Sequence, residues 1–347
     1  MVFPKQEFNK ASVKDANLNK GVLVDLFNKI DKDKLNIHSM VLLKSGSEVF
    51  HASAFEYTED TRDEVYSVSK SFTSIAIGIL CDMDLLHLDD IVLYFFKNEV
   101  KNYLPEYEKL KVKHLLSMTV GQEFDVFKEL TPSDNPFEIF FNQPIAHEPG
   151  TKFYYSNIAS FILSAIITNI TGKSLNDFLN EYLYKKVGIE KPVWNQFENI
   201  NYGATGLQIS THDMARFGLL LLNDGNWDGE QIVSKEYLSV ATKKHIDTPD
   251  TEKECEKYGY GYQFWMNSIG DFRCTGYLGQ YIFINKEFDL VFVVKAHDEK
   301  PLVSLFENFI VTSAKQGWKM CDYSLRDFTR RFKIHSHDLI EEEKENE

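Results

Sequence analysis

A serine and a lysine three residues apart are the first residues in this sequence whose types and spacing suit covalent catalysis. Ser67 and Lys70 lie in VYSVSKSFTS, residues 65–74, and form the only Ser-x-x-Lys pair in the chain. At positions i and i+3 of a helix, the two side chains share one face. Lysine can take the serine proton if burial or a neighbouring cation lowers its pKa from about 10.4 towards neutrality. Taken alone, however, the pattern more often belongs to a solvated lysine.

A tyrosine and an asparagine form a second candidate group. Tyr155 and Asn157 lie in EPGTKFYYSNIAS, residues 148–160, at the head of an apolar helical pattern. A tyrosine acts as a general acid or base when a nearby cation lowers its pKa from about 10. An asparagine can both donate and accept hydrogen bonds. The alternative interpretation is that Tyr155 packs in the core and Asn157 caps the helix.

Two glycines interrupt a strong strand pattern in CTGYLGQYIFIN, residues 274–285. Glycine inside a strand marks a bulge or a close approach of the backbone to a ligand, as Gly276 and Gly279 do in this interpretation. A backbone N–H here and that of Ser67 would form an oxyanion hole, in which one donor is worth about 10²–10³ in rate. A bulged edge strand without function is the alternative.

The Ser67–Lys70 pair must be positioned by a helix, because apolar residues recur through it with helical spacing. The stripe consists of Val68, Phe72, Ile75 and Ile79, widened by Ala76, Ile77 and Leu80. A helix that is apolar over so much of its surface is usually central in the fold.

Similar patterns predict the remaining elements. Helices are predicted around 12–31, 112–121, 153–172, 210–225 and 301–318. Strands are predicted at 258–267, 271–286 and 288–297, and a hairpin around the turn KSGSE at 37–57. Strands at both ends and helices in the middle indicate an α+β fold. We expect an antiparallel sheet flanked by helices, built from residues 1–79 and 231–330, an inserted all-helical domain at 80–230, and an acidic tail at 331–347.

Composition excludes several classes of function. The 347 residues include 52 acidic and 38 basic ones, and the net charge of −14 argues against nucleic acid or an anionic membrane as the main partner. The cysteines Cys81, Cys255, Cys274 and Cys321 show neither C-x-x-C nor metal-ligand spacing, so we expect no disulfide framework and no zinc site. The N-terminus lacks a signal-peptide pattern, and no apolar run could span a bilayer, so we expect a cytoplasmic protein unless a leader was removed.

The three groups occur in one order, and in this the sequence resembles the serine β-lactamase and penicillin-binding-protein superfamily, with its motifs S-x-x-K and K-T-G. It is most similar to the class C β-lactamase and esterase branch, which includes the 6-aminohexanoate-dimer hydrolases. There the middle motif Y-x-N follows P-G-T, as residues 155–157 follow 149–151 here. The stretches HLLSMTVG and GLQISTHDMARFGLLLLNDGNWDGEQIVS also resemble the family, and the likeness runs from about 37 to 312.

The resemblance implies a role for each matching residue. Ser67 would be the acylated nucleophile, and Lys70 would take its proton. Tyr155 would relay a proton to the leaving group and activate the deacylating water. Asn157 would hold substrate or Lys70, and the backbone N–H groups of Ser67 and Tyr277 would bind the oxyanion.

One position departs from the family pattern. Cys274-Thr275-Gly276 stands where the family has Lys-Thr-Gly or His-x-Gly. A neutral cysteine neither stabilises an ionised tyrosine nor attracts a substrate carboxylate. Branches with A-x-G-x-x-G-Q also lack the cation, and CTGYLGQ resembles them more. Arg273 is one residue away and on a strand would point to the opposite face.

The sequence therefore predicts a serine hydrolase that forms an acyl-enzyme with a small ester or amide, without metal or organic cofactor. The alternatives are a β-lactamase or D-alanyl-D-alanine carboxypeptidase and, in another class, a catalytically silent binding or regulatory module. Cys274 has two interpretations. It is either a second nucleophile or a small residue that fills the position where the family has lysine or histidine. Aromatic residues near the motifs suggest a partly apolar pocket. These residues are Tyr66, Phe124, Phe127, Tyr154 and Tyr277.

Overall fold

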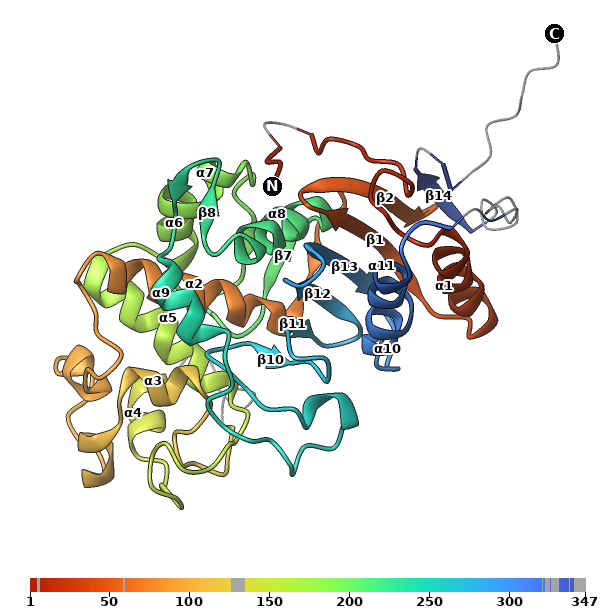
Figure 1. The fold of residues 1–347 in the computed structure, drawn as a ribbon. Coiled ribbons are helices and arrows are strands. Elements are labelled where there is room, and N and C mark those ends of the chain that lie inside the picture. The colour runs from red at the N-terminus through yellow and green to blue at the C-terminus, as the bar shows by residue number, and fades with distance from the viewer. Residues whose placement is uncertain are drawn as a thin grey trace, which may run out of the picture.

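A seven-stranded antiparallel sheet, built from the N-terminal and the C-terminal parts of the chain, is the largest element of the computed structural model (Figure 1). The structure describes residues 1–4, 7–58, 60–125, 135–319, 321, 325, 331–336 and 338–339. The strand order is β10-β11-β12-β13-β1-β2-β14. The strands are β1 Ile37–Lys44, β2 Ser47–Ala54, β10 Trp265–Met266, β11 Phe272–Gly276, β12 Gln280–Asn285, β13 Leu290–Ala296 and β14 Phe332–His335. The predicted α+β fold with an antiparallel sheet is confirmed.

Both faces of the sheet are covered, and successive residues of each strand alternate between two apolar cores. In β1, Val41 packs in the inner core, whereas Met40 and Leu42 pack in the outer core. Helices cover the outer face (Figure 1). They are α1 Lys20–Lys32, α10 Val303–Leu305, η7 Phe306–Val311 and α11 Thr312–Gln316. Burial on both faces explains why these strands are almost continuously apolar in sequence.

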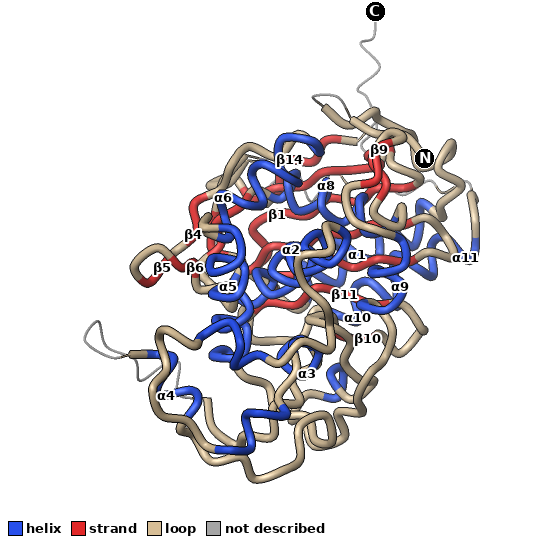
Figure 2. The backbone as a smooth tube through the Cα atoms, turned by 90° about the vertical axis from the view of Figure 1, so that its left-hand side faces the viewer, coloured by secondary structure: helices blue, strands red, loops and turns tan. Residues whose placement is uncertain are grey.

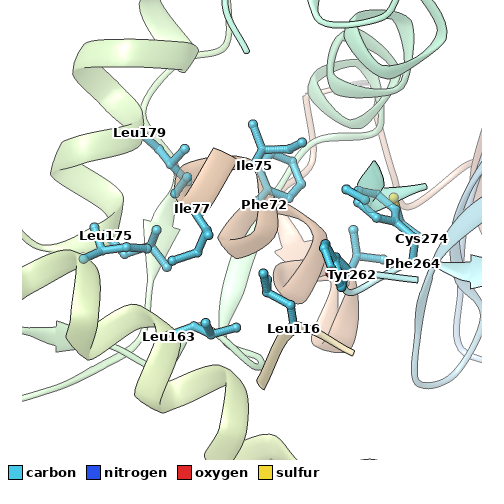
Figure 3. Packing of buried hydrophobic residues seen from close by; sticks show 14 of the residues in the cluster. Phe72, Ile75, Ile77, Leu116, Leu163, Leu175, Leu179, Tyr262, Phe264 and Cys274 are labelled. Atoms are coloured by element: carbon cyan, nitrogen blue, oxygen red, sulfur yellow. The ribbon is translucent and has the colours of Figure 1, made fainter. Parts of the chain in front are cut away.

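The core on the inner side of the sheet contains the helix that holds Lys70, and Ser67 lies in the turn just before it. This helix is α2 Ser69–Asp82, preceded by the 3₁₀ turn η1 Tyr66–Val68, and its residues from Ser69 to Leu80 are buried. Figure 3 shows its surroundings, with Leu163, Leu175 and Leu179 on one side and Phe264 and Cys274 on the other. The prediction of a central helix is confirmed.

Figure 2 shows the inner layer from the helical side, where α2 lies among further helices in front of the strands. The other helical elements are η2 Val92–Phe96, η3 Pro105–Lys109, α3 Val112–Leu116, α4 Pro136–Phe141, α5 Asn157–Thr171, α6 Leu175–Leu179, η5 Asn180–Tyr184, α7 Lys185–Val187, α8 Thr211–Leu222, α9 Lys235–Ala241 and η6 Glu254–Glu256. The short strands are β3 Asp63–Glu64, β4 Val193–Trp194, β5 Gln196–Phe197, β6 Ile200–Asn201, β7 Leu207–Ile209, β8 Asn226–Trp227 and β9 Glu230–Gln231.

The segment predicted to be all-helical thus also contains short strands, from β4 to β9. Runs of two or three residues are too short for any periodicity to reveal them in sequence. Helix α8 of this segment packs against β12 and β13. A Cβ at Gly218 would lie 2.6 Å from Val291 and 2.8 Å from Ile282, so glycine allows this close approach.

Three elements differ from the prediction in their bounds or in their type. The helix predicted at 12–31 begins at Lys20, because Asn19 caps it by accepting a hydrogen bond from the Val22 N–H. Within 258–267 only β10 forms a regular strand, because Gln263 has φ +68 and Gly259 has φ +109. The helix predicted at 301–318 contains the π-helical stretch η7.

The range predicted for the acidic tail, 331–347, includes the last strand of the sheet, β14. Residues of β14 pair with β2, for example Ile334 with Ala52. Phe332 and Ile334 alternate along the strand and join the outer core, and this burial stabilises an edge strand. Residues 340–347, the most acidic part, lie outside the described residues.

Among the described residues, no single helix has the length and apolar character needed to cross a bilayer. One pair, Asn157–Thr171 with Leu175–Val187, meets the criterion of length and composition only when joined across a 69° bend.

Candidate active site

Ser67 lies on a tight turn immediately before α2. The residue before it, Tyr66, has φ +46, a left-handed conformation that is unusual for a non-glycine residue. The turn is fixed by its neighbours, because the Ser69 hydroxyl donates to the Tyr66 carbonyl oxygen at 2.6 Å and the Val65 N–H donates to Leu207 O at 2.9 Å. Such strain persists where the surrounding structure enforces it. Here it holds Ser67 at the wall of a cleft.

Lys70 is buried and surrounded by oxygen atoms, with only 1% of its surface exposed. Its Nζ lies 3.0 Å from Ser67 Oγ, 2.7 Å from Asn157 Oδ1 and 2.9 Å from Ala204 O. Burial lowers the Lys70 pKa from 10.5 to about 7, although the charge of Asp125 opposes this shift. Lys70 is therefore not a solvated surface charge.

The three contacts of Lys70 also determine what it can do once neutral. As an ammonium group it has three N–H donors, one for each oxygen. As an amine it keeps two N–H bonds, which the acceptors Asn157 Oδ1 and Ala204 O can take. The lone pair then remains for the hydroxyl proton of Ser67. The geometry thus suits proton transfer from serine to lysine.

Tyr155 lies beside both residues. Lys70 Nζ is 4.8 Å from the centre of its ring, and its hydroxyl shares a hydrogen bond with Ser67. The ring packs against Trp265, at 5.8 Å between centroids, and Tyr260, at 6.1 Å. Burial raises the Tyr155 pKa above its usual value, and the bond with Ser67 only partly offsets this. The sequence suggests a tyrosine with a lowered pKa, whereas the structure places a protonated hydroxyl next to Ser67.

Asn157 begins α5, and its side chain connects two charged groups. Its Oδ1 accepts from Lys70, while its Nδ2 donates to Asp125 Oδ2 at 2.7 Å. Asp125 also accepts from the backbone N–H of Asn157 and of Ile158. The sequence does not predict a role for Asp125. An acidic side chain can accept hydrogen bonds at a helix N-terminus, but the sequence does not show that Asp125 does so for a helix that begins more than 30 residues later.

Strand β11 closes the opposite side of the turn. A Cβ on Gly276 would lie 2.3 Å from Val65 O. Only glycine at this position therefore allows β11 to lie so close to the Ser67 turn. Tyr277 follows directly, with 57% of its surface exposed, and its ring meets Tyr66 edge-on at 5.7 Å. Thr275 and Gly276 line the same cleft as Ser67. The structure thus places this segment beside Ser67, and the oxyanion hole formed by the two remains a prediction.

Neither Cys274 nor its neighbour Arg273 lines the cleft. Cys274 is 1% exposed, and burial raises its pKa to about 12, so the thiol is neutral at physiological pH. Arg273 is fully buried and donates to Met266 O at 2.6 Å, Asn267 Oδ1 at 2.9 Å and Cys255 O at 2.7 Å. Neither side chain offers a cation to a substrate. A neutral, buried Cys274 also lacks the thiolate character of a nucleophile.

The cleft in front of Ser67 has a volume of about 1150 Å³. Aromatic side chains form part of its wall, among them Tyr154, Tyr155, Trp265 and Tyr277. Its charged lining consists of Glu123, Asp247, Asp250, Glu252, Glu256, Lys152 and Lys253. Acidic groups therefore outnumber basic ones around the opening. Of the aromatic residues named from sequence, Phe124 is 58% exposed, and Phe127 lies outside the described residues.

Replacement of Gly276 by alanine is expected to lower kcat about 10²-fold. The new methyl group would collide with Val65 O and move the β11 backbone away from Ser67, which would weaken the oxyanion donor that the sequence predicts in this segment. Ester hydrolysis by the purified variant measures the effect. Gly21→Ala is the matched control, because its Cβ would have its nearest contacts at 3.4 Å. Equal activity of Gly276→Ala and wild type would contradict this role of β11.

The fold agrees with a family match over most of the chain. Residues 32–312 match the Beta-lactamase family, and the chain belongs to this family, within the serine β-lactamase and penicillin-binding-protein superfamily. Its sequence is similar to Protein flp of Staphylococcus aureus (strain MW2), with 25% identity over 301 residues. That match covers 81% of this chain but 57% of Protein flp, so the chain spans little more than half of that relative.

Solved structures share the fold at low sequence identity. A predicted 6-aminohexanoate-dimer hydrolase from Bacillus anthracis has a TM-score of 0.72 and 23% identity, covering 90% of this chain and 89% of that one. A family VIII carboxylesterase has a TM-score of 0.69 and 15% identity, covering 89% and 99%. Hydrolases, esterases and penicillin-binding-protein homologues thus occur among the structural relatives.

Proposed function

We propose that this chain is a serine hydrolase that cleaves a small ester or amide through an acyl-enzyme. One observation carries the proposal: Lys70 is buried with its Nζ 3.0 Å from Ser67 Oγ, and burial lowers its pKa to about 7. A base that is half neutral near pH 7 can activate serine under ordinary conditions. The family match and the hydrolases among the structural relatives support the same class of reaction.

Acylation begins when Ser67 Oγ attacks the substrate carbonyl carbon and its proton passes to Lys70 Nζ. The carbonyl oxygen becomes an oxyanion, which the backbone N–H groups of Ser67 and Tyr277 stabilise in this proposal. The bond to the leaving group then breaks, and the leaving alcohol or amine takes a proton from Lys70 through the Tyr155 hydroxyl. The product of this step is an ester between Ser67 and the acyl group.

Deacylation repeats the sequence with water. Lys70, again neutral, accepts a proton from the attacking water through Tyr155, and the water oxygen bonds to the acyl carbon. The Ser67 ester bond breaks, Ser67 Oγ recovers a proton, and the carboxylic acid leaves. Because Tyr155 keeps its proton at neutral pH, it passes protons on and does not act as a stored base.

A fluorophosphonate probe tests the proposal directly. Intact-protein mass should show one adduct, and peptide mapping should place it on Ser67. A folded protein that forms no adduct would contradict the hydrolase and favour the binding or regulatory module. An adduct on another residue would contradict the assignment of Ser67.

The cleft also bears on the choice of substrate. A β-lactamase or D-alanyl-D-alanine carboxypeptidase must accept a substrate carboxylate, and neither Cys274 nor Arg273 offers a cation for it. The excess of acidic side chains around the opening repels such a group. We therefore favour uncharged esters and small amides.

A neutral ester should be a better substrate than an otherwise similar ester with a terminal carboxylate. We expect kcat/KM for 4-nitrophenyl butyrate to exceed that for 4-nitrophenyl hemisuccinate at least about tenfold at low salt, and the gap to narrow as salt screens the cleft charges. Rates for both esters at two ionic strengths measure this effect, with spontaneous hydrolysis subtracted. A preference for the hemisuccinate would contradict the proposed preference and revive the β-lactamase alternative.

A further inference from the structure

We propose that Asp125 is a positioning residue of this site, which fixes the orientation of the Asn157 amide and thereby of Lys70. The inference rests on the proposed function, because it assigns Lys70 the role of base. Asp125 belongs to none of the three sequence motifs. It lies on the segment after α3, and its carboxylate reaches the N-terminus of α5.

The hydrogen bonds of Asp125 leave one orientation for the Asn157 amide. Asp125 Oδ2 accepts from Asn157 Nδ2 at 2.7 Å, so the amide nitrogen faces the carboxylate and the amide oxygen faces Lys70 Nζ, also at 2.7 Å. A flipped amide would oppose its oxygen to a carboxylate and its N–H₂ group to the lysine N–H groups. Both contacts would be lost, since carboxylates only accept and ammonium groups only donate.

Asp125 also fastens the helix that carries Asn157. Its Oδ2 accepts from the Asn157 backbone N–H at 3.0 Å, and its Oδ1 accepts from the Ile158 N–H at 3.2 Å. These N–H groups belong to the first turn of α5, where no intrahelical acceptor exists. Ser156 caps the next free group, the Ala159 N–H. A negative charge at this helix end is favourable, so the carboxylate is held in place.

The charge of Asp125 acts on Lys70 as well. The described titratable groups that face Lys70 are Tyr155 and Asp125, and Cys274 faces α2 beside Ser71. Tyr155 and Cys274 are neutral near pH 7, because burial raises the pKa of each. Asp125 is therefore the charged group that opposes deprotonation of Lys70, so its removal should let Lys70 lose its proton at lower pH.

Two variants separate orientation from charge. Asp125→Asn removes the charge and leaves a side chain of nearly the same shape, and Asp125→Ala removes every contact. In wild type we expect kcat to increase with pH as Lys70 loses its proton. In Asp125→Asn this increase should occur at a pH about one unit lower. We expect kcat to fall about 10–100-fold in Asp125→Ala with KM within about threefold of wild type, because the base is misplaced while the cleft is intact.

A double-mutant cycle tests whether Asp125 acts through Asn157. In a protein that already carries Asn157→Ala, the further change Asp125→Ala should reduce kcat by less than about twofold, since the group to be positioned is absent.

The matched control for Asp125→Asn is Asp177→Asn, because Asp177 also lies in the first turn of a helix but pairs with Lys191. It should retain the wild-type rate and pH profile.

An NMR titration of the lysine Cε signals tests the same point without turnover. Loss of one signal in Lys70→Met identifies Lys70, and its midpoint should lie lower in Asp125→Asn than in wild type. Unchanged midpoint, pH profile and kcat in both Asp125 variants would overturn the inference. Absence of activity in the wild type would instead contradict the proposed function, and the titration would still decide on Asp125.

Discussion

Alanine at position 67 is expected to reduce kcat for a 4-nitrophenyl ester by at least about 10⁴-fold and to abolish fluorophosphonate labelling. The hydroxyl that would form the acyl-enzyme is lost, and with it the group to which Lys70 and Tyr155 are hydrogen-bonded. The residual rate would come from the remaining oxyanion donors and from binding. Initial rates and intact-protein mass measure the two effects.

The fold should survive this replacement, because Ser67 is only partly buried and the change removes a single oxygen atom. The melting temperature should stay within about 3 °C of wild type. Ser239→Ala is the matched control, since that serine is exposed and donates to Glu236 O on the same helix. Retention of esterase activity by Ser67→Ala with a native melting curve would contradict the proposed nucleophile.

Methionine at position 70 is expected to lower kcat about 10²–10⁴-fold. Methionine fills a similar volume but has no amine to take the Ser67 proton. Lys70→Arg should be equally impaired, because a guanidinium group does not lose its proton in the accessible pH range. Lys173→Met is the control, since Lys173 is an exposed lysine that pairs with Glu181. Rates on one ester at saturating substrate measure the effect.

The rate of the wild-type protein should depend on pH through the ionisation of Lys70. The reactive form is the neutral amine, and with a pKa of about 7 its fraction increases as pH rises through 7. The rate should therefore rise about tenfold per pH unit below pH 6 and level off above pH 8. A rate that does not change between pH 6 and 10, or one that falls as pH rises through 7, would exclude Lys70 as the base.

Many elements of this fold are predicted by local patterns of apolar and turn-forming residues in the sequence. The hairpin at 37–57 follows from two apolar runs around a turn at Ser45 and Gly46, both of which have positive φ. The burial of α2 follows from apolar side chains that recur around most of its surface. Such features depend on residues a few positions apart, so sequence alone predicts them. Strands of two residues and the start of α1 at Lys20 do not follow, because caps and single left-handed residues decide them.

For the candidate site, the amino-acid sequence specifies which residues are available: Ser67 three residues before Lys70, Tyr155 and Asn157 at a helix start, and glycine at 276. The tertiary structure decided their chemistry. The shift of the Lys70 pKa to about 7 depends on burial among oxygen atoms from other segments.

The neutral state of Tyr155 and the contact between Asp125 and α5 likewise exist only in the folded chain. The physical reason is common to these features. A motif specifies groups that are close in sequence, whereas desolvation, charge and hydrogen-bond partners depend on what the rest of the chain places around them.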